Sequence, residues 1–492
     1  MSGDLETPAL LRATDVTSWT DEADVVIVGL GAAGASAAIE ARSGGADVLV
    51  LERASGGGGA SAIAGGHLYL GGGTPVQKAC GFEDSAEEMY RYLMALTPDP
   101  DAAKIRAYCD DSVAHFGWLE KLGVPFERSY FPEKAAIQDT TQCLIWTGNE
   151  KVWPYRERAK PAPRGHKVAQ AGIEAGSLLM KVLIGAGERL GVRVRCDMRV
   201  VALIADETRR IVGVRYRHFG EHRDVCARRG VVLAAGGYIM NDAMFARELA
   251  WMPRDLIKHG TNNDDGSGIL LGVSAGGEPV GLDRAFLTSP FYPPADMLKG
   301  ILVNALGRRF VAEDSYHGRT AGFLVEQPDG IGYLILDSEI FGYPPYKFFE
   351  QALVDGFETV AEMEARLGLP AGSLSATIDE YNGHARRGED PEFHKYREWL
   401  KPLDKPPYAA FDLSVGRAKF AGFSLGGLRT SVDSEVQDRD GRCVPGLYAA
   451  GACAWNIAQD TRGYSSGTCL GESTYFGRRA GRHAAGRQVA RR

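Results

Sequence analysis

The spacing of apolar residues places a strand, a helix and a second strand near the start of the chain. Val25–Val28 is a β-branched run that ends at a glycine, and the residues after it have the apolar spacing of a helix. A second apolar run, Val48–Leu51, ends in Glu52 and Arg53. The unit from Val25 to Glu52 has the ~30-residue length of a strand–helix–strand unit, and the handedness of such units makes its strands parallel.

Helices and strands continue through the next part of the chain. Between Asp84 and Leu122, apolar residues recur at helical spacing and are interrupted by Pro98 and Pro100, which predicts a helical hairpin. A further helix is predicted over residues 178–190. Apolar runs after it predict strands at residues 192–195, 200–204, 211–217 and 231–234. These elements extend the first unit into an α/β domain.

The character of the sequence changes twice in the second half of the chain. Leu287–Pro294 is rich in proline and aromatic residues, Tyr343–Pro407 is mostly helical and charged in pattern, and apolar glycine motifs return after Ala418. This predicts an α+β domain, residues 288–412, inserted into a domain made of residues 1–287 and 413–492.

Length and composition support two domains. The chain has 492 residues, three to four times the usual ~150 residues of a domain. The 56 Lys and Arg residues against 63 Asp and Glu residues give a net charge of -7. This charge argues against a surface that binds polyanions, so no nucleic-acid partner is expected.

Cysteine usage and the first residues indicate a cytoplasmic protein. The eight cysteines contain no C-x-x-C pair, which argues against a disulfide framework and against a zinc or iron–sulfur site. His218, His222 and Cys226 recur every fourth position, but in a predicted strand hairpin among charged residues, so we interpret them as solvated surface and expect no metal. Met1–Ala23 lacks the pattern of a signal peptide, and no stretch of ~18 apolar residues suggests a membrane span.

The glycine motif Gly29-Leu30-Gly31-Ala32-Ala33-Gly34 predicts a dinucleotide site, because it directly follows a strand, opens a helix and is followed by Glu52 after the second strand. Its glycines let the backbone approach a pyrophosphate at the positive end of the helix, while the carboxylate of Glu52 accepts hydrogen bonds from ribose hydroxyls. The sequence carries this fingerprint once, so a second site for bound NADPH is not expected and the electron acceptor stays open.

Four further segments resemble the fumarate reductase type of flavoprotein: residues 60–66 (ASAIAGG), 232–237 (VLAAGG), 264–268 (DDGSG) and 445–452 (PGLYAAGA). The resemblance covers Asp24 to Gly481 and implies a Rossmann-like domain that binds FAD non-covalently, with an inserted α+β cap that carries part of the catalytic site. Beyond the glycine motif, the residues expected to contact FAD are Glu52, Arg53, Ser61, Ala64, Gly65, Gly66, Val200, Ala235, Gly236, Asp265, Gly451, Ala452, Gly467, Thr468 and Leu470.

Where fumarate reductases carry arginines that bind a dicarboxylate, this sequence has other residues. Tyr464 stands at one such position, and Tyr316 and His317 stand at another. The segments EDSYHGR around Tyr316 and RGYSSG around Tyr464 and Ser466 resemble the 3-ketosteroid dehydrogenases, and among them the Δ4-(5α)-dehydrogenases more closely than the Δ1-dehydrogenases. Phenol groups can donate to a carbonyl oxygen without a counter-charge, so the substrate is expected to be a neutral 3-ketosteroid.

The chemistry implied is desaturation of a 3-keto-5α-steroid to its 4-ene. A base takes the proton from the carbon α to the ketone, and the β hydrogen leaves as a hydride to the flavin. We assign Tyr464 as base, Ser466 as its proton relay and Tyr316 as a second participant from the cap; the opposite division between the two tyrosines stays open. The apolar steroid pocket is expected to include Trp146, Phe286, Phe291, Tyr292 and Phe423.

Three other functions fit the same motifs less well. A Δ1-dehydrogenase is the nearest competitor. A flavin-dependent reductase of a small conjugated acid, of the fumarate or urocanate type, would need a cationic clamp that is missing at the expected positions. A flavin-binding protein without turnover would not need Tyr316 and Tyr464.

Overall fold

A nine-stranded sheet forms the base of the structure, a computed structural model that describes residues 7–134, 138–288, 294–343 and 352–486. The sheet runs in the order β1-β8-β9-β10-β2-β3-β7, and β21 and β20 continue it from β10. Its strands are β1 (Leu11–Arg12), β2 (Asp21–Val28), β3 (Val48–Leu51), β7 (Arg193–Arg195), β8 (Arg199–Ala205), β9 (Ile211–His218), β10 (Glu221–Leu233), β20 (Glu435–Gln437) and β21 (Cys443–Ala449).

The predicted strand–helix–strand unit is confirmed, because β2 and β3 pair in parallel and α1 (Ala32–Ser43) connects them in the sequence. β10 also pairs in parallel with β2 and β21, whereas its pairing with β9 is antiparallel. The predicted strands at 192–195, 200–204, 211–217 and 231–234 correspond to β7, β8, β9 and the end of β10.

Both faces of the sheet are buried, and alternate residues of β2 point into two different apolar clusters. Val25 and Ile27 pack with α1, whereas Val26 and Val28 pack on the opposite face. On the first face lie α1, α8 (Ala175–Arg189) and α14 (Thr468–Ala484). α1 and α14 approach closely, since a Cβ at Gly477 would lie 2.3 Å from the Ala33 carbonyl oxygen.

The region predicted as a helical hairpin contains three helices instead: α4 (Ala86–Leu96), α5 (Ala102–Asp110) and α6 (Ser112–Leu122). The side chain of Asp101 caps α5 by accepting from the backbone N–H groups of Ala103 and Lys104, which explains the restart after Pro100. Asp111 is the C-cap of α5, its N–H bonds back to the carbonyls of Ala107 and Cys109, and the second break lies there. Apolar spacing alone does not show this break.

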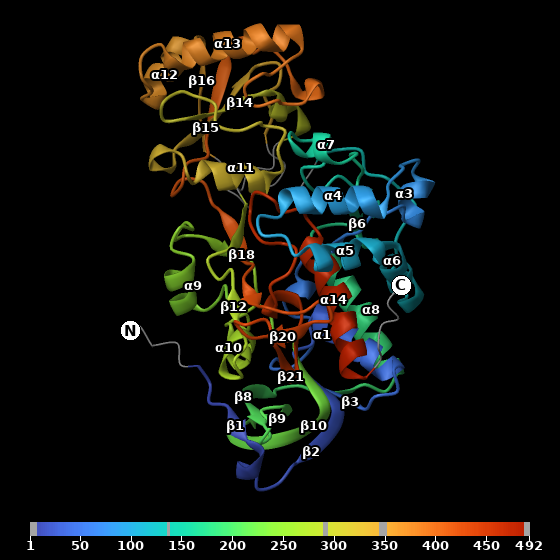
Figure 1. Ribbon diagram of the computed structural model, residues 1–492. Helices are drawn as coiled ribbons and strands as arrows, with labels where there is room; N and C mark the ends of the chain where they lie inside the picture. Colours follow the sequence, from blue (N-terminus) through green and yellow to red (C-terminus); the bar gives the residue numbers. More distant parts are fainter. Residues whose placement is uncertain (1–6, 135–137, 289–293, 344–351, 487–492) are drawn as a thin grey trace.

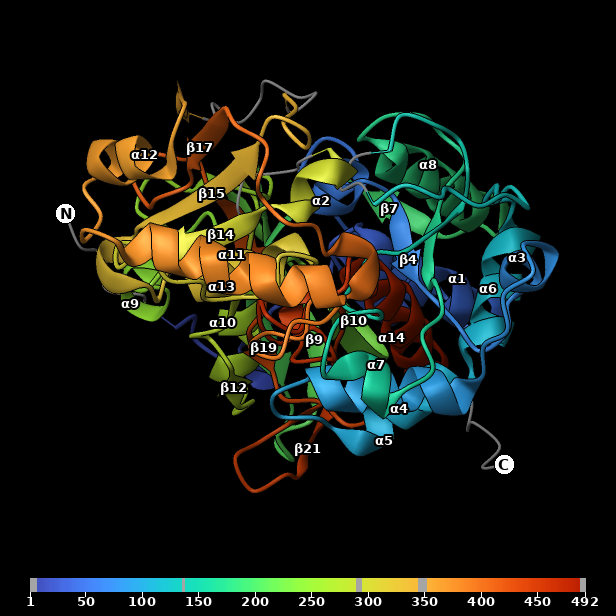
Figure 2. The same ribbon diagram turned by 90° about the horizontal axis from the view of Figure 1, so that it is seen from above.

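A separate antiparallel sheet stands above the nine-stranded sheet in Figure 1, in the order β14-β15-β17-β16. Its strands are β14 (Ile301–Asn304), β15 (Gly332–Asp337), β16 (Ala352–Phe357) and β17 (Tyr408–Asp412). Helices α11 (His317–Leu324), α12 (Val360–Leu367) and α13 (Ser373–Arg387) accompany it, and α13 crosses the view from above (Figure 2). All four strands lie within the predicted cap, although the domain boundaries themselves stay predictions.

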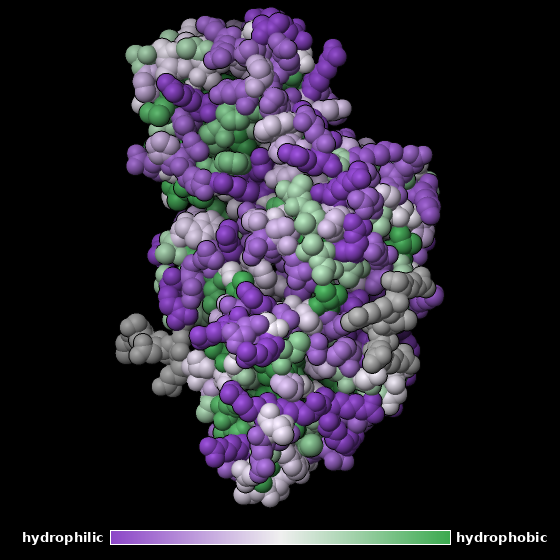
Figure 3. Space-filling model, viewed as in Figure 1, coloured by the Kyte–Doolittle hydropathy of each residue, from purple (hydrophilic) through white to green (hydrophobic). Residues whose placement is uncertain are grey.

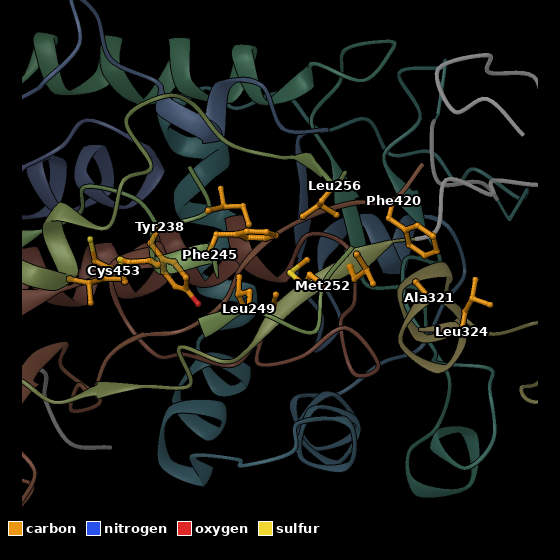
Figure 4. Packing of buried hydrophobic residues seen from close by; sticks show 14 of the residues in the cluster. Tyr238, Phe245, Leu249, Met252, Leu256, Ala321, Leu324, Phe420 and Cys453 are labelled. Carbon is orange, nitrogen blue, oxygen red and sulfur yellow. The ribbon is translucent and has the colours of Figure 1, made fainter. Parts of the chain in front are cut away.

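Three small sheets and a long apolar core connect the two main sheets. The small sheets are β4 (His67–Tyr69), β6 (Gly165–Lys167) and β5 (Leu144–Ile145); β11 (Ile257–Lys258), β18 (Ala421–Ser424) and β13 (Ala285–Thr288); and β12 (Pro279–Val280) with β19 (Gly427–Leu428). α9 (Asp242–Glu248) and α10 (Ser267–Ser274) lie beside them, and the shorter helices are α2 (Gly59–Ala62), α3 (Pro75–Ala79) and α7 (Tyr155–Arg158). One core cluster runs from Tyr238 and Phe245 past Met252 to Leu324 of the cap (Figure 4).

The outer surface gives little further information about function. The face in Figure 3 is mostly hydrophilic, with apolar side chains scattered over it. Among the helices that the structure describes, none has both the length and the apolar composition to cross a bilayer.

Candidate active site

A cavity of about 910 Å³ extends from the turn after β2 to a group of aromatic side chains below the cap. Most residues predicted to contact FAD line it. These are Gly29, Gly31, Ala32, Ala33, Glu52, Arg53, Ser61, Ala64, Gly65, Gly66, Val200, Ala235, Gly236, Gly451, Ala452, Gly467 and Leu470. Gly34, Asp265 and Thr468 are not among its lining residues.

The glycine motif forms a tight turn that directs the N-terminus of α1 at the cavity. Gly29 has a φ of 100°, which favours glycine, and a Cβ at Gly34 would lie 2.0 Å from the Gly29 carbonyl oxygen. Gly34 therefore permits the turn rather than lining the cavity. Gly31 is the N-cap of α1 and carries no capping side chain; the Ala32 N–H donates to the Ser61 hydroxyl at 3.2 Å, and the N-terminus of the helix lies at the cavity.

The carboxylate of Glu52 holds this turn in place. Its Oε2 accepts from the Leu30 N–H at 2.7 Å, and its Oε1 accepts from the Ala54 N–H at 2.8 Å. Each carboxylate oxygen has a second lone pair. Glu52 lines the cavity, so it can still accept hydrogen bonds from a ribose, as the sequence predicts.

Asp265 and Thr468 act behind the cavity wall. Asp265 forms an ion pair with Arg53, which does line the cavity, and accepts from the Ser267 N–H at 3.1 Å. Although burial raises the pKa of Asp265, these two partners lower it overall. The Thr468 hydroxyl donates to the Ser465 carbonyl at 2.8 Å at the start of α14. Asp265 thus supports a cavity residue and Thr468 fixes the loop before α14, and neither side chain faces the cavity.

The far end of the cavity is aromatic and joins segments that are distant in the sequence. Phe286, Tyr316 and Tyr464 belong to one buried cluster, with Phe423 and Cys469 packed against it. The ring centroids of Phe286 and Tyr464 are 4.4 Å apart, and those of Tyr316 and Tyr464 are 6.3 Å apart. The structure therefore brings the two predicted catalytic tyrosines together. Of the other predicted pocket residues, Trp146 lies in a neighbouring cavity, and Phe291 and Tyr292 lie outside the described residues.

The surroundings of Tyr464 favour its neutral form. Burial raises the pKa of Tyr464 well above its usual value of 10, and the nearby Cys469 thiol raises it further. In the part of the chain that the structure describes, its hydroxyl makes no hydrogen bond with Ser466, and Cys469 packs against the same aromatic cluster. A neutral phenol is a good donor and a poor base. Cys469 carries no motif signal, so nothing in the sequence singled it out.

A second cavity, of about 360 Å³, shares four wall residues with the first: His67, Tyr316, His317 and Ser466. Burial lowers the pKa of His67 to about 4 and that of His317 to about 3, so both rings are neutral at pH 7. Buried polar atoms without a hydrogen-bond partner among the described residues line this second cavity. They are His67 Nε2, Thr147 Oγ1, Asp314 Oδ1 and Ser315 Oγ. Such atoms are suited to hold ordered water.

Glu472 of α14 also lines the first cavity and gives a pH-dependent prediction. Burial raises its pKa to about 7, although Oε2 accepts from the N–H groups of Ile457 and Ala458. A raised pKa means that the folded protein loses stability as the pH rises from the ordinary value of ~4.3 toward the folded value. Glu472→Gln keeps an acceptor oxygen without the charge, so the variant should gain stability relative to the wild type more at pH 8 than at pH 5. Thermal unfolding of both proteins at the two pH values measures this; an equal difference at both would contradict it.

Comparison with known proteins agrees with this geometry. Residues 24–468 match the family described as the FAD binding domain. The chain belongs to this family. Its structure is similar to that of a 3-ketosteroid-Δ4-(5α)-dehydrogenase from Rhodococcus jostii RHA1 in complex with 4-androstene-3,17-dione, with 43% sequence identity, a TM-score of 0.92, and coverage of 97% of this chain and 99% of that chain.

Two curated relatives extend over nearly the same length. A 3-oxo-5-alpha-steroid 4-dehydrogenase from Comamonas testosteroni is 30% identical over 89% of this chain and 94% of its own. A vinyl phenol reductase from Lactiplantibacillus plantarum is 28% identical over 94% of this chain and 97% of its own. The sequence-based predictions of the FAD cofactor and of a Rossmann-like α/β fold are confirmed.

The residues present fit FAD. Gly31 lines the cavity, and among the described residues beyond its chain neighbours the only atoms within 4 Å of a Cβ built there are the Ser61 hydroxyl at 3.6 Å and the Gly58 carbonyl oxygen at 4.0 Å, so the turn faces open space in which a pyrophosphate fits. The backbone of residues 29–33 and the Glu52 carboxylate would hold the pyrophosphate and ribose. Gly467 is the N-cap of α14 and carries no capping side chain, so the helix would direct its positive end toward the flavin ring.

Proposed function

We propose that this protein oxidises a 3-keto-5α-steroid to the corresponding 3-keto-4-ene steroid. The observation that carries the proposal is the pairing of Tyr316 and Tyr464 in an apolar pocket at the end of the FAD cavity. Among the described residues that line this cavity, the cations are Arg53 and Arg199, and both pair with Asp265. A neutral ketone fits the tyrosine end, whereas a dicarboxylate would lack a counter-charge there. The similar structure from Rhodococcus jostii supports the substrate class, since it binds 4-androstene-3,17-dione.

Tyr464 is placed to polarise the ketone. Its buried, neutral hydroxyl can donate to the carbonyl oxygen as negative charge develops there, which lowers the energy of the enolate-like transition state. This differs from the base role that the sequence suggested for Tyr464, because burial and the neighbouring Cys469 thiol raise the pKa of Tyr464. Tyr316 is as buried as Tyr464, so Tyr316 and Ser466 act as neutral hydroxyls that relay the proton to water and not as ionised bases.

Ser466 and Tyr316 form part of the wall between the two cavities. A proton removed from the carbon α to the ketone can pass to their hydroxyls and on to water among the polar atoms of the second cavity. Bound FAD supplies the acceptor for the hydride that leaves the β carbon. The substrate thus loses one proton and one hydride, and a double bond forms between the two carbons.

Substrate selectivity tests the proposal. The purified holoprotein is incubated with an artificial electron acceptor and either a 3-keto-5α-steroid or the matching 3-hydroxysteroid, and in a second assay with fumarate and a reduced dye. We expect turnover of the ketone alone. Equal turnover of the 3-hydroxysteroid, or reduction of fumarate, would contradict it.

The cellular location of this activity is part of the proposal. All eight cysteines are free thiols, and they include Cys443, which is exposed, as well as Cys80, Cys196, Cys226 and Cys469, which are partly exposed. Free thiols persist in reducing compartments. We therefore place the protein in the cytoplasm, which cell fractionation would test.

A further inference from the structure

The proposed catalytic residues lie in two segments of the chain, and both segments are hydrogen-bonded to a third segment. Tyr316 precedes α11 in the cap, whereas Tyr464 and Ser466 lie in the loop before α14. Between them runs the loop 147–149, which follows β5. Asn149 in this loop is fully buried.

Asn149 makes a hydrogen bond to each side. Its Oδ1 accepts from the backbone N–H of Tyr316 at 2.9 Å, and its Nδ2 donates to the carbonyl oxygen of Arg462 at 3.3 Å. Its neighbour Thr147 accepts from the Ser466 N–H through its carbonyl at 2.8 Å. A single short loop therefore fixes the backbone at both catalytic segments.

The loop is itself held tightly by α4 and by the segment before α14. The Asn149 N–H donates to the Tyr92 hydroxyl at 2.8 Å, and the same hydroxyl pairs with the Ser465 hydroxyl at 2.9 Å. A Cβ at Gly148 would lie 2.2 Å from Ser465 Oγ and 2.6 Å from Tyr92 Oη. This close packing leaves the loop little freedom to move, so Asn149 presents its amide in one position.

The bond to Tyr316 matters because of where Tyr316 stands. Tyr316 is the N-cap of α11, with extended dihedral angles, and its N–H points out of the helix toward Asn149. Fixing this N–H fixes the Cα of Tyr316 and therefore the position of its ring opposite Tyr464. A displacement of about 1 Å in a catalytic group can reduce a rate about 10²-fold.

We infer that Asn149 is a positioning residue that aligns Tyr316 of the cap with Tyr464 and Ser466; this inference rests on the proposed function. It does not touch the reacting atoms. The oxygen and the nitrogen of its side-chain amide set the distance between the two segments, in the way that supporting residues hold catalytic groups in productive geometry.

Comparison of Asn149→Ala with Asn382→Ala tests the inference. Asn382 is also buried, and it also uses both polar atoms of its side-chain amide. Its Oδ1 accepts from the Leu403 N–H at 2.6 Å, and its Nδ2 donates to the Leu403 carbonyl at 2.9 Å. It lies in α13 and lines neither cavity. We expect both variants to lose thermal stability, but only Asn149→Ala to lose about 10²-fold in kcat and to bind the 4-ene product more weakly. Equal kcat values in the two variants would overturn the inference.

Asn149→Asp adds a pH readout that a purely structural role would not give. When the introduced carboxyl is ionised, it can accept from the Tyr316 N–H but repels the Arg462 carbonyl, whereas the protonated acid restores a donor. Burial raises the pKa of such a carboxyl, so the kcat of this variant relative to wild type should rise as the pH falls. An unchanged ratio would overturn the inference. Wild-type turnover separates the two claims, because failure of the wild type to oxidise the steroid would contradict the proposed function itself.

Discussion

Tyr464→Phe is expected to reduce kcat/KM for a 3-keto-5α-steroid about 10²–10³-fold, the usual effect of removing one donor from a developing oxyanion. The reason is that the phenylalanine ring keeps the contacts with Phe286 and Tyr316 but cannot donate to the ketone oxygen. Steady-state kinetics of the variant and the wild type measure the change. FAD content and thermal stability should stay close to those of the wild type.

Tyr475→Phe is the matched control for this prediction. Tyr475 lies on α14, the helix that follows Tyr464, and is buried. Its hydroxyl donates to the Ala107 carbonyl at 2.8 Å, but the residue lines neither cavity. We expect this variant to lose some stability and keep its kcat/KM. If Tyr464→Phe retained more than a tenth of the wild-type kcat/KM, the role of Tyr464 as ketone donor would be wrong.

Arg309→Met is expected to destabilise the cap by about 3–5 kcal/mol, as breaking a buried ion pair does. The Arg309 guanidinium contacts Glu313 at 2.8 Å and Asp390 at 2.9 Å, and these three side chains are at most 3% exposed. Lys395 contacts Glu313 at 3.2 Å. Without Arg309, Glu313 keeps its contact with Lys395, whereas Asp390 loses the cation that it contacts. Denaturant unfolding followed by tryptophan fluorescence measures the loss.

The pH dependence of this loss follows from the two carboxylates. Although burial raises the pKa of Glu313 and of Asp390, Arg309 outweighs it and the pKa of each is lowered overall. The stabilisation is therefore complete above the ordinary pKa of ~4 and disappears as the pH falls below it. The difference between wild type and Arg309→Met should shrink in acid. Arg386→Ala, which breaks an exposed pair with Asp404, should cost at most about 1 kcal/mol; a similar loss in both variants would contradict this account.

The parts of the site that are encoded locally could be predicted from the sequence. The turn from Gly29 to Gly34 and the carboxylate of Glu52 follow from a motif within one strand–helix–strand unit, and in the structure Glu52 accepts from the Leu30 N–H of that turn. Asp265 and Thr468 belong to similarly clear motifs, but a motif does not tell whether a side chain faces the ligand or supports the residue that does.

The parts that depend on contacts between distant segments could not be predicted. Asn149 meets Tyr316 and Arg462 only because the cap folds over the loop after β5. The presence of Cys469 near Tyr464 depends on how α14 begins, since the first turn of that helix brings Cys469 against the aromatic cluster. The pKa of Tyr464 depends on burial, which no motif records.

Anaerobic mixing of the purified holoprotein with a 3-keto-5α-steroid tests whether the protein forms the 4-ene. The flavin absorbance is followed in a single turnover, and the product is identified by mass spectrometry and NMR. We expect loss of the oxidised flavin absorbance with formation of the 4-ene. Formation of a 1-ene, or no loss of absorbance with any 3-ketosteroid, would contradict it.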